Sequence, residues 1–322
     1  MKTNKQQTNK QALLNHKVLC SLLAAGFFCS WGAAAPVYAA VATQKVVNSD
    51  LAGGLETNSE SVKVTGGSRI TGTVKVINDA NYQTGAHGSA FSIQTDGQVI
   101  FDGDGDVEIR TYNDDSYAHT NAIKLHNDGA SLLVDKAGHS VTLALDAAGG
   151  QSTKYDEVAG IYLTNNNQNV VINADNVNFE NNGYNRGYGI WTGASAVDSI
   201  ITINGNANFS DDAAAKEAYA IRHDHGTTVI NGNTKITMVG AGGSGIRAIN
   251  GAVQFNGDTV IDLKGDVAYI DRNVPAFGIW NGATPYGVTP TTGAHVKLTG
   301  NTQINTTAVS YTHLTLPTKL EV

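Results

Sequence analysis

The chain repeats a short phrase, and this repeat constrains its fold more than any other feature of the sequence. A small residue followed by Ile or Phe recurs seven times, at spacings between 25 and 38 residues. A period in this range is typical of stacked-repeat proteins, in which one small structural unit packs on the next. The seven pairs are Ala90-Phe91, Ala122-Ile123, Gly160-Ile161, Gly189-Ile190, Ala220-Ile221, Gly245-Ile246 and Gly278-Ile279.

A second phrase, an alternating strand that ends in an Asn-Gly, Asp-Gly or Thr-Gly turn, follows most of these pairs. Gly and Asn both tolerate positive φ and therefore favour a tight turn. A third apolar segment comes after the turn, as in residues 234–239. The turn phrases are Val99–Asp104, Ile201–Asn206, Thr228–Asn233, Val253–Asp258 and Val296–Asn301.

The segment from Tyr219 to Ser244 contains the strands and turns of one complete unit. Because one unit cannot bury its own apolar residues, units stacked about 4.8 Å apart would cover one another. The chain is therefore predicted to be all-β, a right-handed parallel β-helix (solenoid) with about three short strands per coil. The small residue before Ile is expected at an inward or corner position. The Asn-Gly pairs are also compatible with β-hairpins, which stay the alternative.

The N-terminus has the pattern of a Sec-type signal peptide over residues 1–39. Four lysines and no acidic residue accompany an apolar run, and small residues precede a cleavage point after Ala39. An uncleaved membrane anchor is the alternative. Cys20 and Cys29, the only cysteines, both lie in this segment, so the mature chain is expected to fold without disulfides.

Three further segments follow the signal peptide. Residues 40–61 are predicted to form an N-terminal lead-in or cap, and residues 62–308 the β-helix itself. Residues 309–318 break the repeat and resemble a translated transposase adapter used in preparing DNA sequencing libraries. Residues 309–322 are therefore predicted to be a non-native tail and the chain a fragment, with a natural C-terminal strand as the alternative.

Composition excludes several classes of function. The formal net charge is −7, and the predicted signal peptide is basic, so the mature chain is near −11. This excludes the basic footprint of a nucleic-acid-binding protein. The sequence contains no phosphate-cradling loop and no serine-protease phrase, and no cofactor is predicted.

The two repeated phrases, stacked without cysteines behind a Sec signal, resemble the passenger domains of autotransporters, the type V secretion family of Gram-negative bacteria. The resemblance covers Val62 to Ile304. It implies a structural rod or adhesin at the cell surface, not an enzyme, held in the outer membrane by a C-terminal β-barrel. The strands of such a barrel do not occur in this sequence. The implied partners are a host-surface glycan or protein, or a second copy of the rod.

Two other functions stay open. Some parallel β-helix proteins cleave polysaccharides, so a secreted pectin-lyase-like enzyme is the first alternative. A secreted surface fibre without a barrel is the second. An enzyme would need charged side chains clustered on one face of adjacent coils. The candidates for such a cluster are Asp128, Asp135, Asp156, Glu157, Arg222, Arg247 and Arg272.

Ligand binding is predicted at Trp191, Trp280, Arg222 and Arg247. Each of them follows an Ile of the first phrase, so strand alternation favours an outward side chain. Outward tryptophans would form a stacking surface for sugar rings, and the two arginines are expected to stack on one face. The alternative is that the tryptophans belong to the core and the arginines are ordinary exposed positions.

No metal site is predicted, although two segments carry suitable side chains. Asp102, Asp104 and Asp106 alternate with glycines, but the Gly and Glu that an EF-hand loop requires are absent. His223 and His225 would share one face of an extended segment. No second His or Cys cluster completes a site in the sequence, so both segments are interpreted as turns.

Overall fold

The computed structural model describes residues 44–78, 89–113, 121–147, 157–184, 186–212, 218–240, 243–264, 268–269, 274–275, 277–281 and 294–306. Every regular element in these ranges is a β-strand, so the predicted all-β class is confirmed. These ranges include no helix with the length and apolarity needed to cross a membrane. The predicted signal peptide and the tail at residues 309–322 lie outside the described residues.

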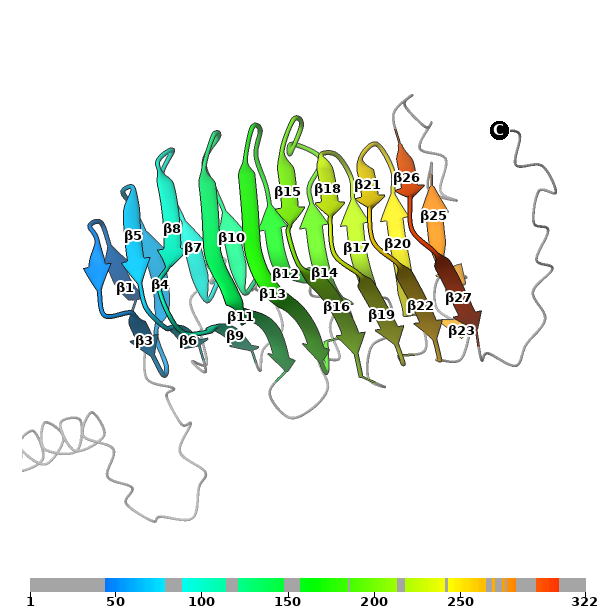
Figure 1. Ribbon diagram of the computed structural model, residues 1–322, viewed down its shortest axis with the longest axis horizontal. Helices are drawn as coiled ribbons and strands as arrows, with labels where there is room; N and C mark the ends of the chain where they lie inside the picture. The colour runs from blue at the N-terminus through cyan, green and yellow to red at the C-terminus, as the bar shows by residue number, and fades with distance from the viewer. Residues whose placement is uncertain are drawn as a thin grey trace, which may run out of the picture. The chain divides into compact units, whose positions relative to one another are not determined.

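The strands form three parallel columns (Figure 1), and the first column is a nine-stranded sheet. Each strand of this column pairs with the corresponding strand of the next coil. In order along the stack they are β1 (Gln44–Val47), β4 (Ser61–Val64), β7 (Phe91–Ile93), β10 (Ile123–Leu125), β12 (Glu157–Leu163), β14 (Arg186–Thr192), β17 (Tyr219–His223), β20 (Ser244–Ala248) and β25 (Ile279–Asn281).

The second and third columns belong to one 16-stranded sheet. Strands of the second column alone are β2 (Leu51–Ala52), β5 (Ser68–Thr71), β8 (Gln98–Asp102), β15 (Ile200–Ile203), β18 (Thr227–Ile230), β21 (Ala252–Phe255) and β26 (His295–Leu298). Strands of the third column alone are β3 (Leu55–Thr57), β6 (Val74–Asn78), β9 (Val107–Asn113), β16 (Asn206–Asp211), β19 (Thr234–Met238), β22 (Thr259–Leu263) and β27 (Thr302–Thr306). Two long strands take part in both columns, β11 (Ser131–Ala147) and β13 (Asn169–Asn182).

The repeated phrases lie in register from coil to coil. Ile161 pairs with Ile123 on one side and with Ile190 on the other. All pairings within the three columns are parallel, and among the described strands only the short β23 (Ala268–Tyr269) and β24 (Val274–Pro275) pair antiparallel. The hairpin alternative for the Asn-Gly turns is therefore wrong, and the predicted stacking of Ile on Ile is confirmed.

The apolar residues of the three columns meet inside the coils and form one continuous core. Ile190, Ile203 and Phe209 come from the first, second and third columns, and each is at most 2% exposed. Like residues also stack along the columns, since the rings of Phe179 and Phe209 lie 4.6 Å apart and are tilted by only 3°. Such ring pairs add attraction beyond the area that they bury.

The small residue before Ile faces this core, as predicted. A Cβ atom at Gly160 would lie 2.8 Å from Cδ1 of Phe179 and 2.7 Å from the carbonyl oxygen of Gly189. At Gly189 a Cβ atom would overlap Phe209. Glycine is required at these two positions because the first column approaches the third column and the neighbouring coil too closely for a side chain.

Asparagine side chains link the coils at the turn between the second and third columns. Nδ2 of Asn204 donates to Oδ1 of Asn173 at 2.8 Å, and Asn231 and Asn256 each donate to the preceding Asn at 2.6 Å. Asn173 in turn donates to a carboxylate oxygen of Asp135 at 3.2 Å. The Asn residues therefore shape their own turns and also bond to the neighbouring coil.

Two features differ from the expected coil. Strands β11 and β13 continue through the bend where a turn was expected, with an irregular register between Lys136 and Ser140. The extra residues of β11 form a bulge that absorbs the bend. The stack also begins earlier than expected, because β1 already pairs with β4. Residues from 44 onward, predicted as a lead-in or cap, thus form a coil.

We expect Gly189→Ala to destabilise the fold. The added methyl group would overlap Phe209 and lie 2.6 Å from the carbonyl oxygen of Ala220, and overpacking a dense core costs about 1–3 kcal/mol. The free energy of unfolding from urea denaturation measures this loss. Gly67→Ala is the control, because its nearest new contact is 3.5 Å, and its effect should stay within about 0.5 kcal/mol. Equal losses in both variants would contradict the inward position of Gly189.

Candidate functional site

The four residues predicted to bind a ligand lie in one row on the outer side of the first column. Trp191 pairs in register with Arg222, Arg222 with Arg247, and Arg247 with Trp280. The row therefore crosses β14, β17, β20 and β25, and the expectation that the two arginines share a face agrees with this register. Strand alternation places these side chains on the side opposite to the core.

Two residues that were not among the predicted site residues extend the row. Lys124 pairs with Tyr162, and Tyr162 pairs with Trp191. Lys124 is 8% exposed, its Nζ lies 5.4 Å from the centre of the Tyr162 ring, and burial lowers its pKa. Both follow the Ile of the first phrase, so this position in the repeat is the signal that could have found them. The outer row comprises Lys124, Tyr162, Trp191, Arg222, Arg247 and Trp280.

Trp191 is enclosed within the outer row. The ring of Tyr162 stacks on it at 4.1 Å with a tilt of 10°, and the guanidinium carbon of Arg222, on the next strand, lies 4.9 Å from its centre. Only 6% of Trp191 is exposed. The side chain is outside the main core, yet its own neighbours cover it. Trp191 thus does not present an open stacking surface, whereas Trp280 is half-buried.

A second row of aromatic rings borders the outer row, and the two rows together form a cluster separate from the main core. The rings of Tyr188 and Tyr219 lie 5.5 Å apart, and Phe277 lies 5.8 Å from Tyr219. Nη1 of Arg222 donates to the hydroxyl of Tyr188 at 3.0 Å, and the guanidinium carbon of Arg247 lies 5.7 Å from the Tyr219 ring. These contacts hold both guanidinium groups against aromatic faces.

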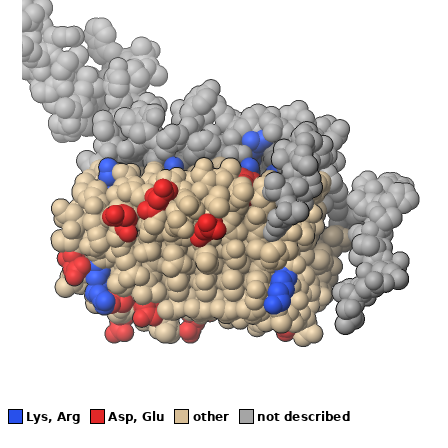
Figure 2. Space-filling view, turned by 90° about the horizontal axis from the view of Figure 1, so that it is seen from above, with Lys and Arg blue, Asp and Glu red and all other residues tan. Residues whose placement is uncertain are grey.

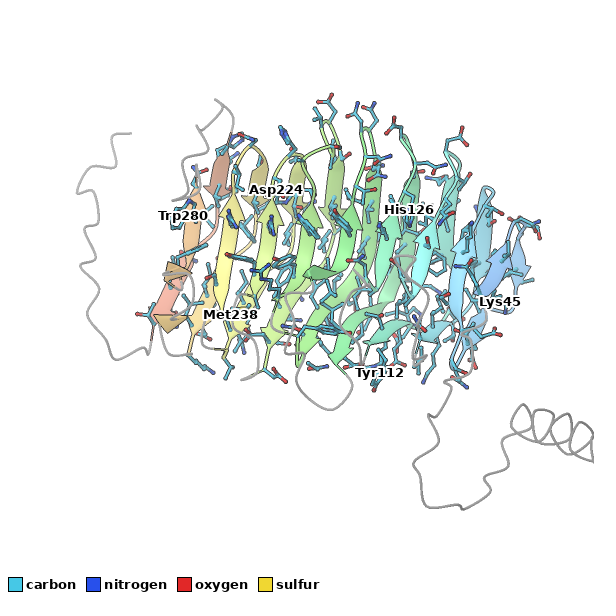
Figure 3. The ribbon with its side chains drawn as sticks, turned by 180° about the vertical axis from the view of Figure 1, so that it is seen from behind. Lys45, Tyr112, His126, Asp224, Met238 and Trp280 are labelled. Carbon is cyan, nitrogen blue, oxygen red and sulfur yellow. The ribbon has the colours of Figure 1, made fainter. Side chains whose placement is uncertain are left out.

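Asp224 partly neutralises the outer row. Its carboxylate lies 3.3 Å from Nη2 of Arg222 and accepts the indole N–H of Trp191 at 3.2 Å. No carboxylate of the described residues lies within 4.0 Å of Arg247. Asp224 and Trp280 are labelled in Figure 3, where side chains recur from strand to strand along the stack.

The charge of the outer row contrasts with that of the chain. The formal net charge is −7, and Figure 2 shows a face on which charged side chains are few and scattered. Two arginines at neighbouring register positions therefore give a local excess of positive charge. Such a patch favours an anionic partner.

A charge cluster that the sequence did not predict lies on the outer side of the third column. Nε of Arg110 donates to Glu108 at 2.6 Å, and its Nη atoms lie 3.3 Å from Asp146 and 3.4 Å from Glu180. Lys75 also pairs with Glu108 at 3.1 Å. The hydrogen bond from Arg110 lowers the pKa of Glu108. A general acid needs a raised pKa, so Glu108 is not suited to that role.

The carboxylates predicted for a catalytic cluster do not pair with Arg222 or Arg247 in the described part of the chain. Asp128 is exposed and accepts the backbone N–H of Asn166 at 3.1 Å, while Asp135 lies at one end of the Asn ladder. No ion pair in the described residues joins either one to Arg222 or Arg247. Outside the described residues lie Asp156, Arg272 and the side chain of Glu157.

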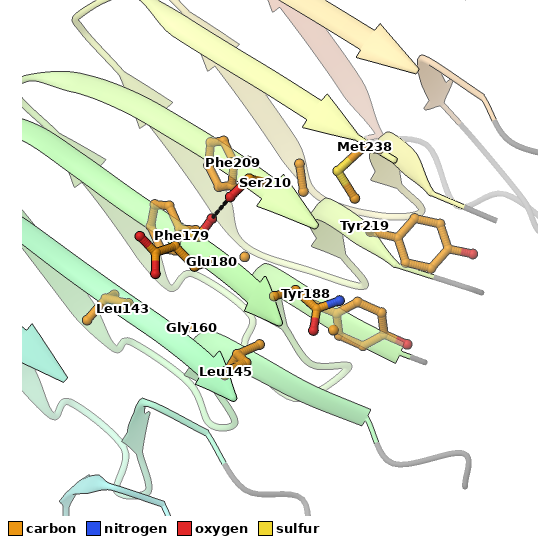
Figure 4. Close-up of a pocket in the computed structure, with 14 residues that line it drawn as sticks. Leu143, Leu145, Gly160, Phe179, Glu180, Tyr188, Phe209, Ser210, Tyr219 and Met238 are labelled. Carbon is orange, nitrogen blue, oxygen red and sulfur yellow. Dashed lines mark hydrogen bonds between the residues drawn. The ribbon is translucent and has the colours of Figure 1, made fainter. Parts of the chain in front are cut away.

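A small cavity lies between the first and third columns (Figure 4). Gly160 and Gly189 line it from the first column, and Phe179, Phe209 and Met238 from the third. Its volume is about 10 Å³, which is room for about one water molecule. This cavity does not accommodate a sugar ring.

The carboxylates of Asp102, Asp104 and Asp106 do not converge on one point. Asp102 pairs with Arg69, and Asp106 accepts the backbone N–H of Ser140 at 2.9 Å. The side chain of Asp104 is fully exposed. Asp104 and Asp106 both lie within 4.0 Å of the His139 imidazole, whereas Asp102 faces Arg69. This arrangement agrees with the interpretation of the segment as a turn.

The ammonium group of Lys136 binds the backbone carbonyl groups of this turn, as a bound metal cation would. Its Nζ donates to the carbonyl oxygens of Gly72 at 2.6 Å, Asp102 at 2.8 Å and Gly103 at 3.0 Å. Lys136 is 1% exposed, and burial lowers its pKa. The turn thus receives its positive charge from the next coil of the same chain.

His223 and His225 do not form a pair of metal ligands. His223 is completely buried, with Nδ1 at 2.6 Å from the hydroxyl of Thr192 and Nε2 at 2.8 Å from that of Thr228. His225 contributes only its backbone oxygen to this network. Burial lowers the pKa of His223 to about 4. Across the described ranges, no group of three or more His, Cys, Asp or Glu residues is arranged to hold a metal ion.

Asp211, at the end of β16, is the other strongly perturbed group. Burial raises its pKa to about 7, although backbone hydrogen bonds oppose this effect. Oδ1 accepts the N–H groups of Val239 and Gly240, the latter at 3.3 Å. Asp211 therefore attaches the backbone that follows β19 to the preceding coil, which is a structural role.

A scan against protein-family models, a search of curated proteins and a search of solved structures each gave no match. The function of the outer row must therefore be argued from its geometry and charge alone.

We expect Lys136→Met to lower the free energy of unfolding by about 2–4 kcal/mol, because three carbonyl groups would lose a buried charged donor. Urea denaturation measures this change. Lys75→Met is the control, since Lys75 belongs to a surface ion pair with 40% of its side chain exposed, and it should cost less than about 1 kcal/mol. If Lys136→Met loses no more stability than the control, the three hydrogen bonds of the Lys136 ammonium group do not stabilise the turn.

The pH dependence of stability should distinguish His223 from Asp211. The pKa of His223 is about 4 in the fold against an ordinary 6.5, so its contribution to stability is lost as the pH falls from 6.5 toward 4. The pKa of Asp211 is about 7 against 3.8, so its contribution is lost as the pH rises through that range. The two effects oppose each other in the wild type.

Asp211→Asn removes the effect of Asp211 and leaves that of His223 unopposed. The free energy of unfolding of this variant should rise by on the order of 3 kcal/mol from pH 4 to 6.5, and that of the wild type by much less. Urea denaturation across this range measures both profiles. The exposed Asp128→Asn is the control and should follow the wild type. If Asp211→Asn and wild type show identical pH profiles, Asp211 and His223 do not have opposing effects on stability.

Proposed function

We propose that this chain is the passenger region of an autotransporter-like protein, a right-handed parallel β-helix that acts as a rod and adhesin on a Gram-negative cell. The coil-to-coil register is the observation that carries the proposal. It links nine successive strands of the first column, and the Asn ladder adds side-chain bonds outside the backbone. A stack of this kind extends without disulfides, which suits a chain whose cysteines lie in the predicted signal peptide.

The outer row supports the adhesive part of the proposal. Side chains at one position of the repeat recur at the strand spacing of about 4.8 Å. Cationic and aromatic groups in such a row suit several contacts with one extended partner, such as a host-surface glycan or protein, or with a second rod. In this proposal Sec exports the chain, and a β-barrel encoded downstream of the repeat anchors it in the outer membrane.

A secreted polysaccharide-acting enzyme of the pectin-lyase-like kind is the second candidate, and the charge cluster of the third column favours it. Arg110 gathers Glu108, Asp146 and Glu180 on one face, each within 3.4 Å of its guanidinium group. Two carboxylates on one face are the usual requirement for glycoside hydrolysis. Release of oligosaccharides by wild type, but not by Glu180→Gln, would favour the enzyme over the rod.

Surface display tests the leading proposal. DNA downstream of the codon for Thr306 is expected to encode the alternating ten-residue strands of a β-barrel. Protease added to intact cells should then remove the passenger, while a periplasmic marker protein in the same cells stays uncut. A passenger cut only after the outer membrane is permeabilised would reject surface display. A stop codon soon after Ile304, with the product in the medium, would favour a fibre without a barrel.

A further inference from the structure

We propose that the C-terminal end of the outer row binds a carboxylated glycan, an extended polysaccharide that contains uronic acids. Arg247 contacts the sugar carboxylate, and the sugar ring packs against Trp280. This proposal rests on the adhesive part of the proposed function and names the class of ligand. Three observations carry it.

The first observation is that the two arginines of the row are neighbours. Arg222 and Arg247 pair in register on β17 and β20, so their side chains start one strand spacing apart, about 4.8 Å. Like charges on directly opposite positions of paired strands destabilise a sheet. Asp224 relieves part of this repulsion at Arg222, and an anion bound beside Arg247 would relieve the rest.

The second observation is that the two guanidinium groups have different partners. Arg222 donates to the carboxylate of Asp224 and to the hydroxyl of Tyr188. Arg247 lies against the Tyr219 ring at 5.7 Å, and no carboxylate of the described residues pairs with it. Its donors suit a planar acceptor with two oxygens, and a sugar carboxylate has this geometry.

The third observation is the position of Trp280. It pairs in register with Arg247, and its ring lies 5.1 Å from the ring of Phe277. Trp280 is half-buried, unlike the enclosed Trp191. An aromatic ring beside a cation gives a pyranose ring an apolar surface while its carboxylate reaches the guanidinium group. Partial burial of both residues strengthens the charged contact by excluding water.

Binding of three polymers to the purified full chain tests the proposal. Polygalacturonate carries carboxylates, dextran sulfate carries sulfates, and dextran is uncharged. In biolayer interferometry we expect polygalacturonate to bind most tightly, with an affinity that falls as the salt concentration rises. Arg247→Gln should lower this affinity about 10- to 100-fold, because it removes a charged hydrogen-bonded pair. Trp280→Ala should lower the affinity as well.

Two further variants serve as controls. Lys235→Gln removes one exposed positive charge from the third column and should bind as the wild type does. Arg247→Lys retains the charge without the planar fork, so its affinity should lie between those of the wild type and Arg247→Gln. Urea denaturation shows whether each variant is folded. If Arg247→Gln does not fold, Arg247→Lys decides the question, since unchanged affinity overturns the assignment.

The proposal is overturned by unchanged binding of polygalacturonate to Arg247→Gln, or by equal binding of dextran. Tighter binding of dextran sulfate overturns the carboxylate preference. These outcomes are independent of the display experiment. A protein that is displayed but does not bind polygalacturonate rejects only the ligand, and binding without display rejects only the autotransporter proposal.

Discussion

Hydrogen bonding between coils in a fixed parallel register is the interaction on which the rest of the structure depends. One coil cannot bury its own apolar residues, so each coil is stable only when its neighbours cover it. A shift of one residue in the pairing would turn the inward side chains outward. Gly160 and Gly189 show how closely the register is specified, because a methyl group at either position would meet the neighbouring coil and the third column.

The same register organises the outer surface. Residues at one position of the repeat form a row, and the residue types at that position decide which contacts form along the row. Where the position holds Asn, the amides bond to one another, as Asn204 does with Asn173 and Asn231. Where it holds cations and aromatic rings, these groups stack, as Trp191 and Arg222 do. Repetition of a coil can therefore build an extended binding surface without a cavity.

The features that could be predicted from the sequence are those encoded within one coil. The pair Gly189-Ile190 marks the inward positions, and alternation then places the next residue, Trp191, outside. The contacts of Lys136 could not be predicted in this way, because its carbonyl partners are 33 to 64 residues away and no side-chain pattern marks a carbonyl group. The cluster of Arg110 was missed for the same reason, since Glu180 is 70 residues distant. Coil lengths vary, so only the observed register brings these groups together.

The two arginines of the outer row have surroundings that differ from those of Lys136 and Arg110. Lys136 donates to three carbonyl groups, and Arg110 meets three carboxylates. Arg222 and Arg247, by contrast, lie side by side, and within the described residues no ion pair joins Arg247 to a carboxylate. Proteins break such local rules mainly at functional sites, where an interaction with a ligand offsets the lost stability. In the proposed glycan site, the sugar carboxylate would balance the positive charge at Arg247, which no carboxylate of the described residues pairs with.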